Sequence, residues 1–374
     1  MKHWQETNEI LDRLAELTAA GQHAAIACVV AISGSAYRRP GARLLIAADG
    51  STLGGISGGC LEEDVRQAGL GAIEGGDCRL LHYETGDDDE ALWGLGLGCD
   101  GEVDVLVAPS TRPGFHQAAG RLRALLGGDN AFAAVTVLGT TSSSAAGEGT
   151  VTSIDGRMLI LGSNPDVAAN TGDAEVDDAL LAAANDAADA GASRIVLVDG
   201  VRAFVEVFEP PPYLVICGAG DDAMPMVRTA ADAGFRVLVV DHRPAYLATD
   251  RFPSAWRLVE ALPDDALDIP AGADTFVVLK THNLARDKAW ARRFLAAPIP
   301  YLGLLGPRAR CEEIADEAAA HDRERIFAPV GLDLGAEGPE QVGLAVVAEL
   351  LALRSGRSPG HLKDRDAPIH DREQ

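Results

Sequence analysis

Tyr213-Leu-Val-Ile-Cys-Gly-Ala-Gly220 decides the fold of the second half of this chain. Its first five residues form a short apolar run that predicts a buried strand. Gly218, Gly220 and Ala223 then complete the pattern G-x-G-x-x-A. In this pattern the first glycine permits a tight turn, the second lets backbone N–H groups approach a phosphate, and the third residue allows close helix packing. The stretch therefore predicts the opening of a nucleotide-binding unit.

The residues after this turn continue the same unit. Periodicity predicts a helix over 224–234 and a second strand over 235–240, with Asp241 at its end. An acidic residue there can hold a ribose hydroxyl, and the amino end of the helix favours a phosphate. Asp221 opposes this, because a carboxylate at the helix start repels a pyrophosphate. We predict a Rossmann-type doubly wound parallel sheet, and leave its crevice open between NAD, NADP and no dinucleotide.

Two later strands extend the crevice. Predicted strands over 274–279 and 300–305 lead into His282 and into Gly306 and Arg308, and ligands of doubly wound folds bind at such carboxyl ends. The alternative, that these residues cap helices or lie solvated in loops, carries equal weight. The predicted crevice residues are Gly218, Gly220, Asp221, Ala223, Asp241, His242, Arg243, His282, Gly306 and Arg308.

Length and composition limit the remaining possibilities. The 374 residues predict two globular α/β domains, and a net charge of −24 argues against nucleic acid and anionic membranes as partners. We expect a cytoplasmic protein, since the sequence shows neither a signal peptide nor an apolar run long enough to span a bilayer. Six cysteines without a C-x-x-C pair argue against disulfides and zinc, and we predict no protein-bound metal.

Three prolines in Glu209-Pro-Pro-Pro212 mark the clearest domain boundary, because proline cannot join a helix and stiffens a connection. We predict a mixed α/β domain over 1–209, the Rossmann-type domain over 210–355 and a tail over 356–374. The polar, small residues of 140–149 indicate a mobile loop. For the first domain, patterning predicts helices over 6–20, 57–73, 115–126 and 176–190, and strands over 24–32, 43–47, 79–83, 103–108, 133–138 and 194–198.

One loop of the first domain, Ser33-Gly-Ser-Ala-Tyr-Arg-Arg-Pro-Gly-Ala-Arg43, gathers three guanidinium groups in an acidic protein. Arg38, Arg39 and Arg43, together with Ser35, suit bidentate binding of a phosphate or carboxylate. The alternative is that the arginines pair with surface carboxylates, which contributes little to stability. We favour anion binding.

A second motif, Ser57-Gly-Gly-Cys-Leu-Glu-Glu-Asp64, looks like a helix start with Ser57 as its N-cap. Cys60 would then lie in the first turn, where the helix dipole lowers the pKa of a thiol, and Gly58 and Gly59 precede it. Cys99 lies in the glycine-rich loop 94–101, which is flexible enough to approach Cys60. A functional and a structural role for these two cysteines are equally compatible with the sequence. Cys28 and Cys217 lie inside apolar strands and are interpreted as packing residues.

Taken together, these motifs resemble the XdhC/CoxI family of xanthine dehydrogenase accessory proteins over nearly the whole chain. The chain departs from the usual family pattern at Asp221, where histidine is common, and at Tyr37, where proline is common. The matching motifs are Gly34–Arg43, Ser57–Glu62, Gly96–Gly101, Gly218–Gly220, Val239–Pro244, Thr281-His282 with Asp287, Gly303–Gly306, Pro329–Pro339 and Pro368–His370.

The resemblance implies a chaperone for the molybdenum cofactor, in its molybdopterin or dinucleotide form. Such a protein binds the cofactor, protects it while a cysteine desulfurase adds the terminal sulfide, and delivers it to an apo molybdenum hydroxylase. Arg38, Arg39 and Arg43 would hold the phosphate or dinucleotide tail, and Cys60 or Cys99 would lie at the molybdenum or the dithiolene. No catalytic residue is implied, and a homodimer is compatible with the sequence.

The main alternative is an NAD(P)-dependent oxidoreductase that uses His282 as a proton donor. The chain lacks a cysteine set for iron–sulfur clusters, so it is not itself a complete xanthine dehydrogenase. A nucleotidyltransferase is weaker still, because the glycine turn lacks the lysine of a P-loop. We favour a non-catalytic accessory factor.

Overall fold

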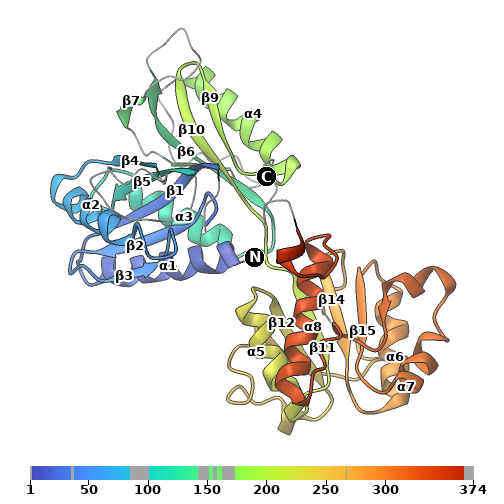
Figure 1. Ribbon diagram of the computed structural model, residues 1–374. Coiled ribbons are helices and arrows are strands. Elements are labelled where there is room, and N and C mark those ends of the chain that lie inside the picture. Colours follow the sequence, from blue (N-terminus) through green and yellow to red (C-terminus); the bar gives the residue numbers. More distant parts are fainter. Residues whose placement is uncertain are drawn as a thin grey trace. The chain divides into compact units, whose positions relative to one another are not determined.

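The computed structural model describes residues 2–34, 38–84, 101–141, 151–154, 158–161, 173–266 and 268–365. The chain divides into two compact units, one formed chiefly by residues 3–210 and the other by residues 211–364 (Figure 1). The division falls between Pro210 and Pro211, inside the proline run. Among the described residues, every helix is too short or too polar to traverse a lipid bilayer.

The first unit combines four helices with ten strands in the described part of the chain. The helices are α1 (Lys2–Ala19), α2 (Glu62–Gly75), α3 (Phe115–Leu126) and α4 (Ala174–Ala190). The strands are β1 (Ala24–Gly34), β2 (Arg43–Ala47), β3 (Thr52–Gly54), β4 (Arg79–Glu84), β5 (Gly101–Pro109), β6 (Phe132–Thr141), β7 (Val151–Ile154), β8 (Met158–Leu161), β9 (Arg194–Val198) and β10 (Val201–Phe208).

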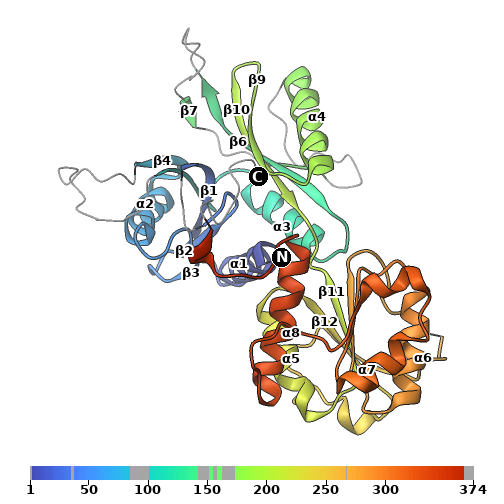
Figure 2. The ribbon, with the colours of Figure 1, turned by 45° about the vertical axis from the view of Figure 1, so that its right-hand side comes forward.

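These strands form two antiparallel sheets. The first has the order β3-β2-β1-β5-β4, and the second has the order β7-β6-β10-β9 with β8 also paired to β6. Side chains alternate along β2, so that Leu44 and Ile46 pack with α2 on one face while Leu45 packs with α1 and α3 on the other. The helix α4 covers the second sheet through Leu180 and its neighbours (Figure 2).

The second unit is a parallel sheet covered by helices on both faces. Its strands are β11 (Tyr213–Cys217), β12 (Arg236–Asp241), β13 (Arg257–Glu260), β14 (Thr275–Leu279), β15 (Tyr301–Leu304) and β16 (Ile326–Phe327). Its α-helices are α5 (Met224–Asp232), α6 (Leu284–Leu295), α7 (Arg308–Ala315) and α8 (Gly338–Arg354). Short 3-10 turns are η1 (Asp221–Ala223), η2 (Pro244–Tyr246), η3 (Ala320–Arg325) and η4 (Leu362–Asp364).

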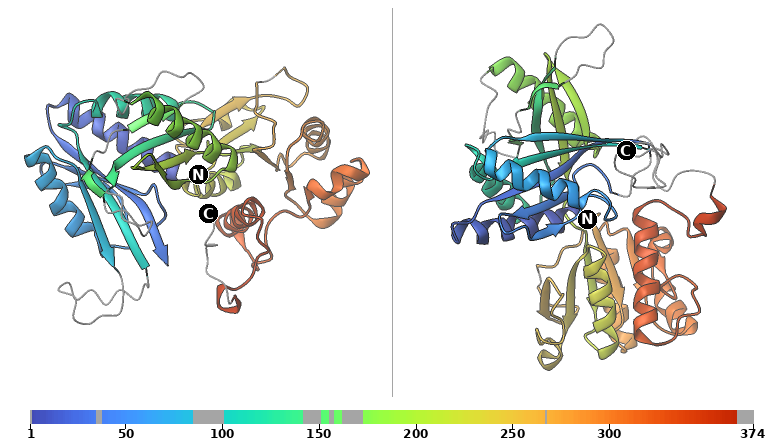
Figure 3. Two further views of the ribbon diagram at one scale, coloured as in Figure 1. Left: turned by 90° about the horizontal axis from the view of Figure 1, so that it is seen from above. Right: turned by 60° about the vertical axis from the view of Figure 1, so that its left-hand side comes forward.

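The strand order β13-β12-β11-β14-β15-β16, with every pair parallel, is that of a Rossmann fold. The helices α5 and α8 lie side by side on one face, and α6 and α7 cover the other (Figure 3). The order reverses at β11, so the crevice lies at the carboxyl ends of β11 and β14. The predicted fold class, a mixed α/β domain followed by a Rossmann-type domain, is confirmed.

Two local predictions are corrected. The helix expected from Ser57 begins at Glu62, because the Ser57 hydroxyl and the Glu62 carboxylate bind the backbone of residues 56–61 as a loop. Cys60 therefore precedes the first turn instead of lying in it. Thr140 and Thr141 end β6 instead of opening a loop, and residues 142–149 of the expected loop lie outside the described residues.

Candidate functional site

The glycine turn after β11 is a tight turn, as predicted. Its two glycines lie close to other residues of the same domain, Gly218 to Lys280 and Gly220 to Asp222. Gly218 has φ +121°, and a Cβ there would lie 2.4 Å from the carbonyl oxygen of Lys280. A Cβ on Gly220 would lie 2.6 Å from Oδ1 of Asp222. Ala223, which directly precedes α5, is fully buried. The first glycine is therefore required by the neighbouring strand end, and the second faces a carboxylate of its own chain.

The carboxylate of Asp241 is fully engaged within the unit. Its Oδ2 accepts a hydrogen bond from the backbone N–H of Ala219 at 2.8 Å. The Arg243 guanidinium donates through Nε and a terminal nitrogen to its two oxygens, both at 2.9 Å, and His242 Nδ1 lies 3.1 Å from Oδ1. Burial raises the pKa of Asp241, but Arg243 and the Ala219 amide outweigh burial and hold this pKa well below its ordinary value. A ribose hydroxyl would have to compete with Arg243 for this carboxylate.

Asp221 lies at the surface and is paired with an arginine. Its carboxylate is 92% exposed and lies 2.6 Å from Arg251. Arg251 also donates to the carbonyl oxygens of Ala219, at 3.1 Å, and Tyr246, at 2.6 Å. The negative charge of Asp221, which the sequence sets at the helix start, is thus paired with Arg251.

The sequence analysis missed the charged group at the centre of this crevice. Lys280 follows β14 directly, and its fully buried side chain donates from Nζ to Oδ1 of Asp222 at 2.6 Å. His282 Nε2 lies 3.2 Å from the other oxygen of the same carboxylate. Burial lowers the pKa of Lys280, even though Asp222 acts in the opposite direction. A signal was available, since Lys280 is a rare lysine in this chain and directly follows an apolar strand.

The loop after β15 is joined to the loop after β14. Asp287, which is buried, accepts hydrogen bonds from the Thr281 hydroxyl at 2.6 Å and from Arg310 at 2.5 Å. Gly306 has φ +151° and packs against the Arg310 side chain. Arg308, at the start of α7, is exposed and makes no side-chain hydrogen bond or ion pair within the described part of the chain. Because its guanidinium is exposed and unpaired within the described residues, Arg308 is available to bind a ligand.

In the first unit the three arginines of the loop differ in their surroundings. Arg43 is buried and forms a bidentate pair with Glu206, with one N–O distance of 2.7 Å, and it also donates to Thr7 and to the Gly41 carbonyl. Its charge is neutralised inside the unit, so we assign it a structural role in place of the anion-binding role that the sequence indicates. Arg38 pairs with Glu6. Arg39 is exposed, without a side-chain partner among the described residues.

The cysteine loop is ordered by a single carboxylate. Glu62 accepts hydrogen bonds from the backbone N–H groups of Ile56, at 3.2 Å, and Ser57, at 2.8 Å, and also from the Ser57 hydroxyl. The Ser57 hydroxyl lies 3.5 Å from the Cys60 sulfur. Gly58 and Gly59 are exposed, and a Cβ on Gly59 would meet nothing within 4 Å. The loop holds a partly exposed thiol beside open space.

Strand register places the ends of these motifs at two levels of the first sheet. Gly34, the last residue of β1, pairs with Gly101, the first of β5, and Glu84, the last of β4, pairs with Glu102. The Gly55 N–H donates to the Arg43 carbonyl at 2.8 Å, so the cysteine loop leaves the sheet beside Arg43, the residue that ends the arginine loop. Arg43 pairs with Cys28, so this point lies nearer the middle of β1 than its Gly34 end. Ser35 and Cys99 lie outside the described residues, and the strand ends nearest to them, Gly34 and Gly101, pair with each other.

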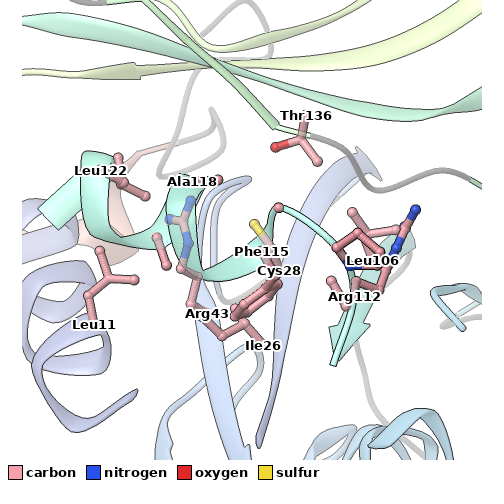
Figure 4. A pocket seen from close by; sticks show the side chains of 14 residues that line it. Leu11, Ile26, Cys28, Arg43, Leu106, Arg112, Phe115, Ala118, Leu122 and Thr136 are labelled. Carbon is pink, nitrogen blue, oxygen red and sulfur yellow. The ribbon is translucent and has the colours of Figure 1, made fainter. Parts of the chain in front are cut away.

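The first unit also contains a mainly apolar cavity of about 130 Å³ between the two sheets and α3 (Figure 4). The Cys28 thiol and the Thr136 hydroxyl are two of its polar groups (Figure 4). Burial raises the pKa of Cys28 to about 12, so this thiol stays protonated at neutral pH. We interpret Cys28 as a packing residue of the cavity wall.

These features define a two-domain protein with a thiol and arginine loop cluster on its first domain and a Rossmann crevice on its second. Family models match both parts: the XdhC and CoxI family over residues 17–84 and the XdhC Rossmann domain over residues 214–350. A Bacillus subtilis (strain 168) protein, named as a probable xanthine dehydrogenase subunit, is 30% identical over 338 residues, covering 89% of this chain and 94% of that protein. The chain belongs to the XdhC and CoxI family.

Two further similarities extend this result. A solved structure described as a xanthine dehydrogenase from Bacillus halodurans has a TM-score of 0.74 at 25% identity, and the match covers 93% of this chain and 96% of that one. The uncharacterized protein YqeB of Escherichia coli (strain K12) is 32% identical over 168 residues, which span 42% of this chain and 30% of YqeB. The resemblance inferred from the motifs is confirmed.

Proposed function

We propose that this protein is an accessory factor of a xanthine dehydrogenase-type molybdenum hydroxylase, and that it binds the molybdenum cofactor and delivers it to the apoenzyme. The family membership and the names of the two Bacillus proteins support the association with xanthine dehydrogenase. The observation that carries the finer proposal is the convergence of the arginine loop and the cysteine loop beside Arg43, the first residue of β2.

The residues of these two loops fit the chemistry of such a ligand. The exposed guanidinium of Arg39 can bind a phosphate group with two parallel hydrogen bonds, and Arg38 can do so by exchanging Glu6 for the ligand. The Cys60 thiol is a soft donor next to the open space at Gly59. The cofactor would supply the oxygen-transfer chemistry of the client enzyme, while this chain binds, orients and shields it.

Before delivery, the cofactor must also receive its terminal sulfide. We propose that a cysteine desulfurase adds the terminal sulfide while the cofactor rests on this chain, so the partners are that desulfurase and the apo hydroxylase. A partly exposed loop thiol suits this task, because the desulfurase must be able to reach the site. No residue of the chain needs to act as a catalyst in this scheme.

The test is the cofactor content of the full chain purified from a cofactor-producing host, with molybdenum and pterin both quantified. We expect Cys60→Ser and Arg39→Gln each to lower the content at least several-fold. The matched controls are Cys78→Ser, a partly exposed thiol beside Arg112, and Arg13→Gln, a surface arginine beside Glu16. Wild-type protein without molybdenum and pterin, also after incubation with free cofactor, would contradict the proposal.

One contact in the crevice argues against the alternative of an NAD(P)-dependent oxidoreductase. Arg243 already occupies both oxygens of the Asp241 carboxylate, which would otherwise hold a ribose hydroxyl of the dinucleotide. Hydride transfer from NADH by the purified chain would favour the alternative.

A further inference from the structure

The Rossmann crevice contains a buried ammonium group that the proposed function does not use. The side chain of Lys280 is fully buried, and lysine is rarely buried to this extent unless it is paired. An ammonium group carries three donors, yet Asp222 is its one hydrogen-bond partner among the described residues. The site therefore has capacity for further acceptor oxygens.

Asp222 occupies the place where a ligand is expected. In a Rossmann fold the phosphate of a nucleotide lies over the second glycine of the turn, at the amino end of the following helix. Here Oδ1 of Asp222 is 2.6 Å from the position of a Cβ on Gly220, directly over that glycine. The carboxylate thus presents oxygens to Lys280 as a phosphate would.

His282 completes the group. Its Nε2 lies 3.2 Å from Oδ2 of Asp222, and its backbone has φ +56°, a conformation that residues other than glycine seldom adopt. The ring is two-thirds exposed, whereas Asp222 is one-third exposed, so both can rearrange without unfolding the strand ends. A ligand oxygen that replaces the carboxylate would meet the same two donors.

We propose that Lys280 and His282 form a phosphate-binding site of the Rossmann domain, and that the Asp222 carboxylate fills this site until the phosphate group of a nucleotide displaces it. Displacement turns Asp222 toward solvent and leaves Lys280 paired with the phosphate. The neighbouring carboxylates do not take its place, since Asp241 is bound to Arg243 and Asp221 to Arg251. The proposal goes beyond cofactor delivery by the first domain and stands or falls separately from it.

The experiment compares two adjacent isosteric variants of the full chain, Asp222→Asn and Asp221→Asn, by calorimetric titration with AMP, inorganic phosphate and adenosine. Asp222→Asn is expected to bind AMP and phosphate at least ten-fold more tightly than wild type, because it removes the competing charge from Lys280. Asp221→Asn is expected to change either affinity less than two-fold. The affinity for adenosine, which lacks the phosphate, should be the same in Asp222→Asn and in wild type.

The second comparison tests the two donors in the Asp222→Asn background, where the Asp222 carboxylate no longer competes for them. Adding Lys280→Met to Asp222→Asn should abolish the gained affinity for AMP and phosphate. Adding His282→Gly should reduce this affinity several-fold, and glycine adopts the positive φ of position 282 without strain. Circular dichroism and thermal unfolding verify that each variant is folded. Equal gains in Asp221→Asn and Asp222→Asn would indicate a general charge effect and overturn the proposal, as would affinity that survives the loss of Lys280.

Discussion

Arg43 and Glu206 are 163 residues apart in the sequence, yet their side chains form a bidentate ion pair inside the first domain. The pair joins β2 of one sheet to β10 of the other, and His3 on α1 contacts the same carboxylate at 2.5 Å. Because Arg43 belongs to the arginine loop and Gly41 also packs against this pair, the ion pair sets the position of the loop. The C-terminal end of the arginine loop is therefore held in place by the buried Arg43–Glu206 ion pair.

The first prediction concerns the stability of this pair. Arg43→Ala leaves the buried Glu206 carboxylate without its main partner, and we expect a loss of about 3–5 kcal/mol in the free energy of unfolding. Arg13→Ala, which removes an exposed arginine beside Glu16, should cost less than about 1 kcal/mol. Urea unfolding of the two variants measures the difference, and equal losses would disprove the structural role.

The second prediction is a dependence of stability on pH. Burial raises the pKa of Glu206, but Arg43 and His3 outweigh burial and lower this pKa from 4.5 to about 2. The stabilisation is therefore fully present above pH 4.5 and is lost as the pH falls toward 2. Wild type should lose more stability between about pH 5 and pH 3 than the double variant Arg43→Met, Glu206→Gln, as followed by urea unfolding. Parallel pH profiles would show that Glu206 contributes nothing to acid sensitivity.

The third prediction separates two glycines of one turn. Gly218→Ala forces an alanine to φ +121° and a Cβ to 2.4 Å from a backbone carbonyl, so we expect a loss of more than about 2 kcal/mol. Gly220→Ala meets only the side chain of Asp222, which can move, and should cost less. Gly272→Ala, which meets nothing within 4 Å, is the control in the same thermal unfolding experiment. A larger loss for Gly220→Ala than for Gly218→Ala would contradict this geometry.

The fourth prediction orders the thiols by reactivity. Cys60 and Cys28 are both partly exposed, Cys60 in a loop and Cys28 on the wall of the cavity, whereas Cys217 is buried. Burial raises the pKa of Cys28 to about 12 and raises that of Cys217 as well. At about pH 8 we expect iodoacetamide to modify Cys60 well before Cys28 and Cys217, as read by peptide mass spectrometry. In urea the three rates should converge. Modification of Cys28 in the folded protein as rapidly as Cys60 would refute the assignment of a packing role.

Sequence patterns predicted the elements whose ends carry a strong local signal. The bounds of β2, β9, β11 and α3 agree with the expected ranges, because apolar β-branched runs or helical periodicity end there at glycine, proline or polar residues. The short strand β13 and the helix α8 were not predicted. The former has only four residues, and the latter is apolar on several sides, which weakens its period.

The charge pairs of the sites could not be predicted, because each depends on which strands become neighbours. Lys280 meets Asp222 across 58 residues only because β14 inserts next to β11. The glycine pattern indicated the turn correctly, but it carried no information on the side chain that lies over it. Likewise, the sequence places Arg43 at the start of a strand, but only its ion pair with Glu206 of β10 shows that it is buried and neutralised, unlike Arg39.

The most direct test of the central claim is transfer. The full chain loaded with molybdenum cofactor is mixed with an apo xanthine dehydrogenase-type hydroxylase, and the gain of xanthine oxidation is followed against an equal amount of free cofactor. The account predicts faster and more complete activation from the loaded chain, and a reduced advantage with Cys60→Ser. Equal activation by the free cofactor and the loaded chain would contradict it.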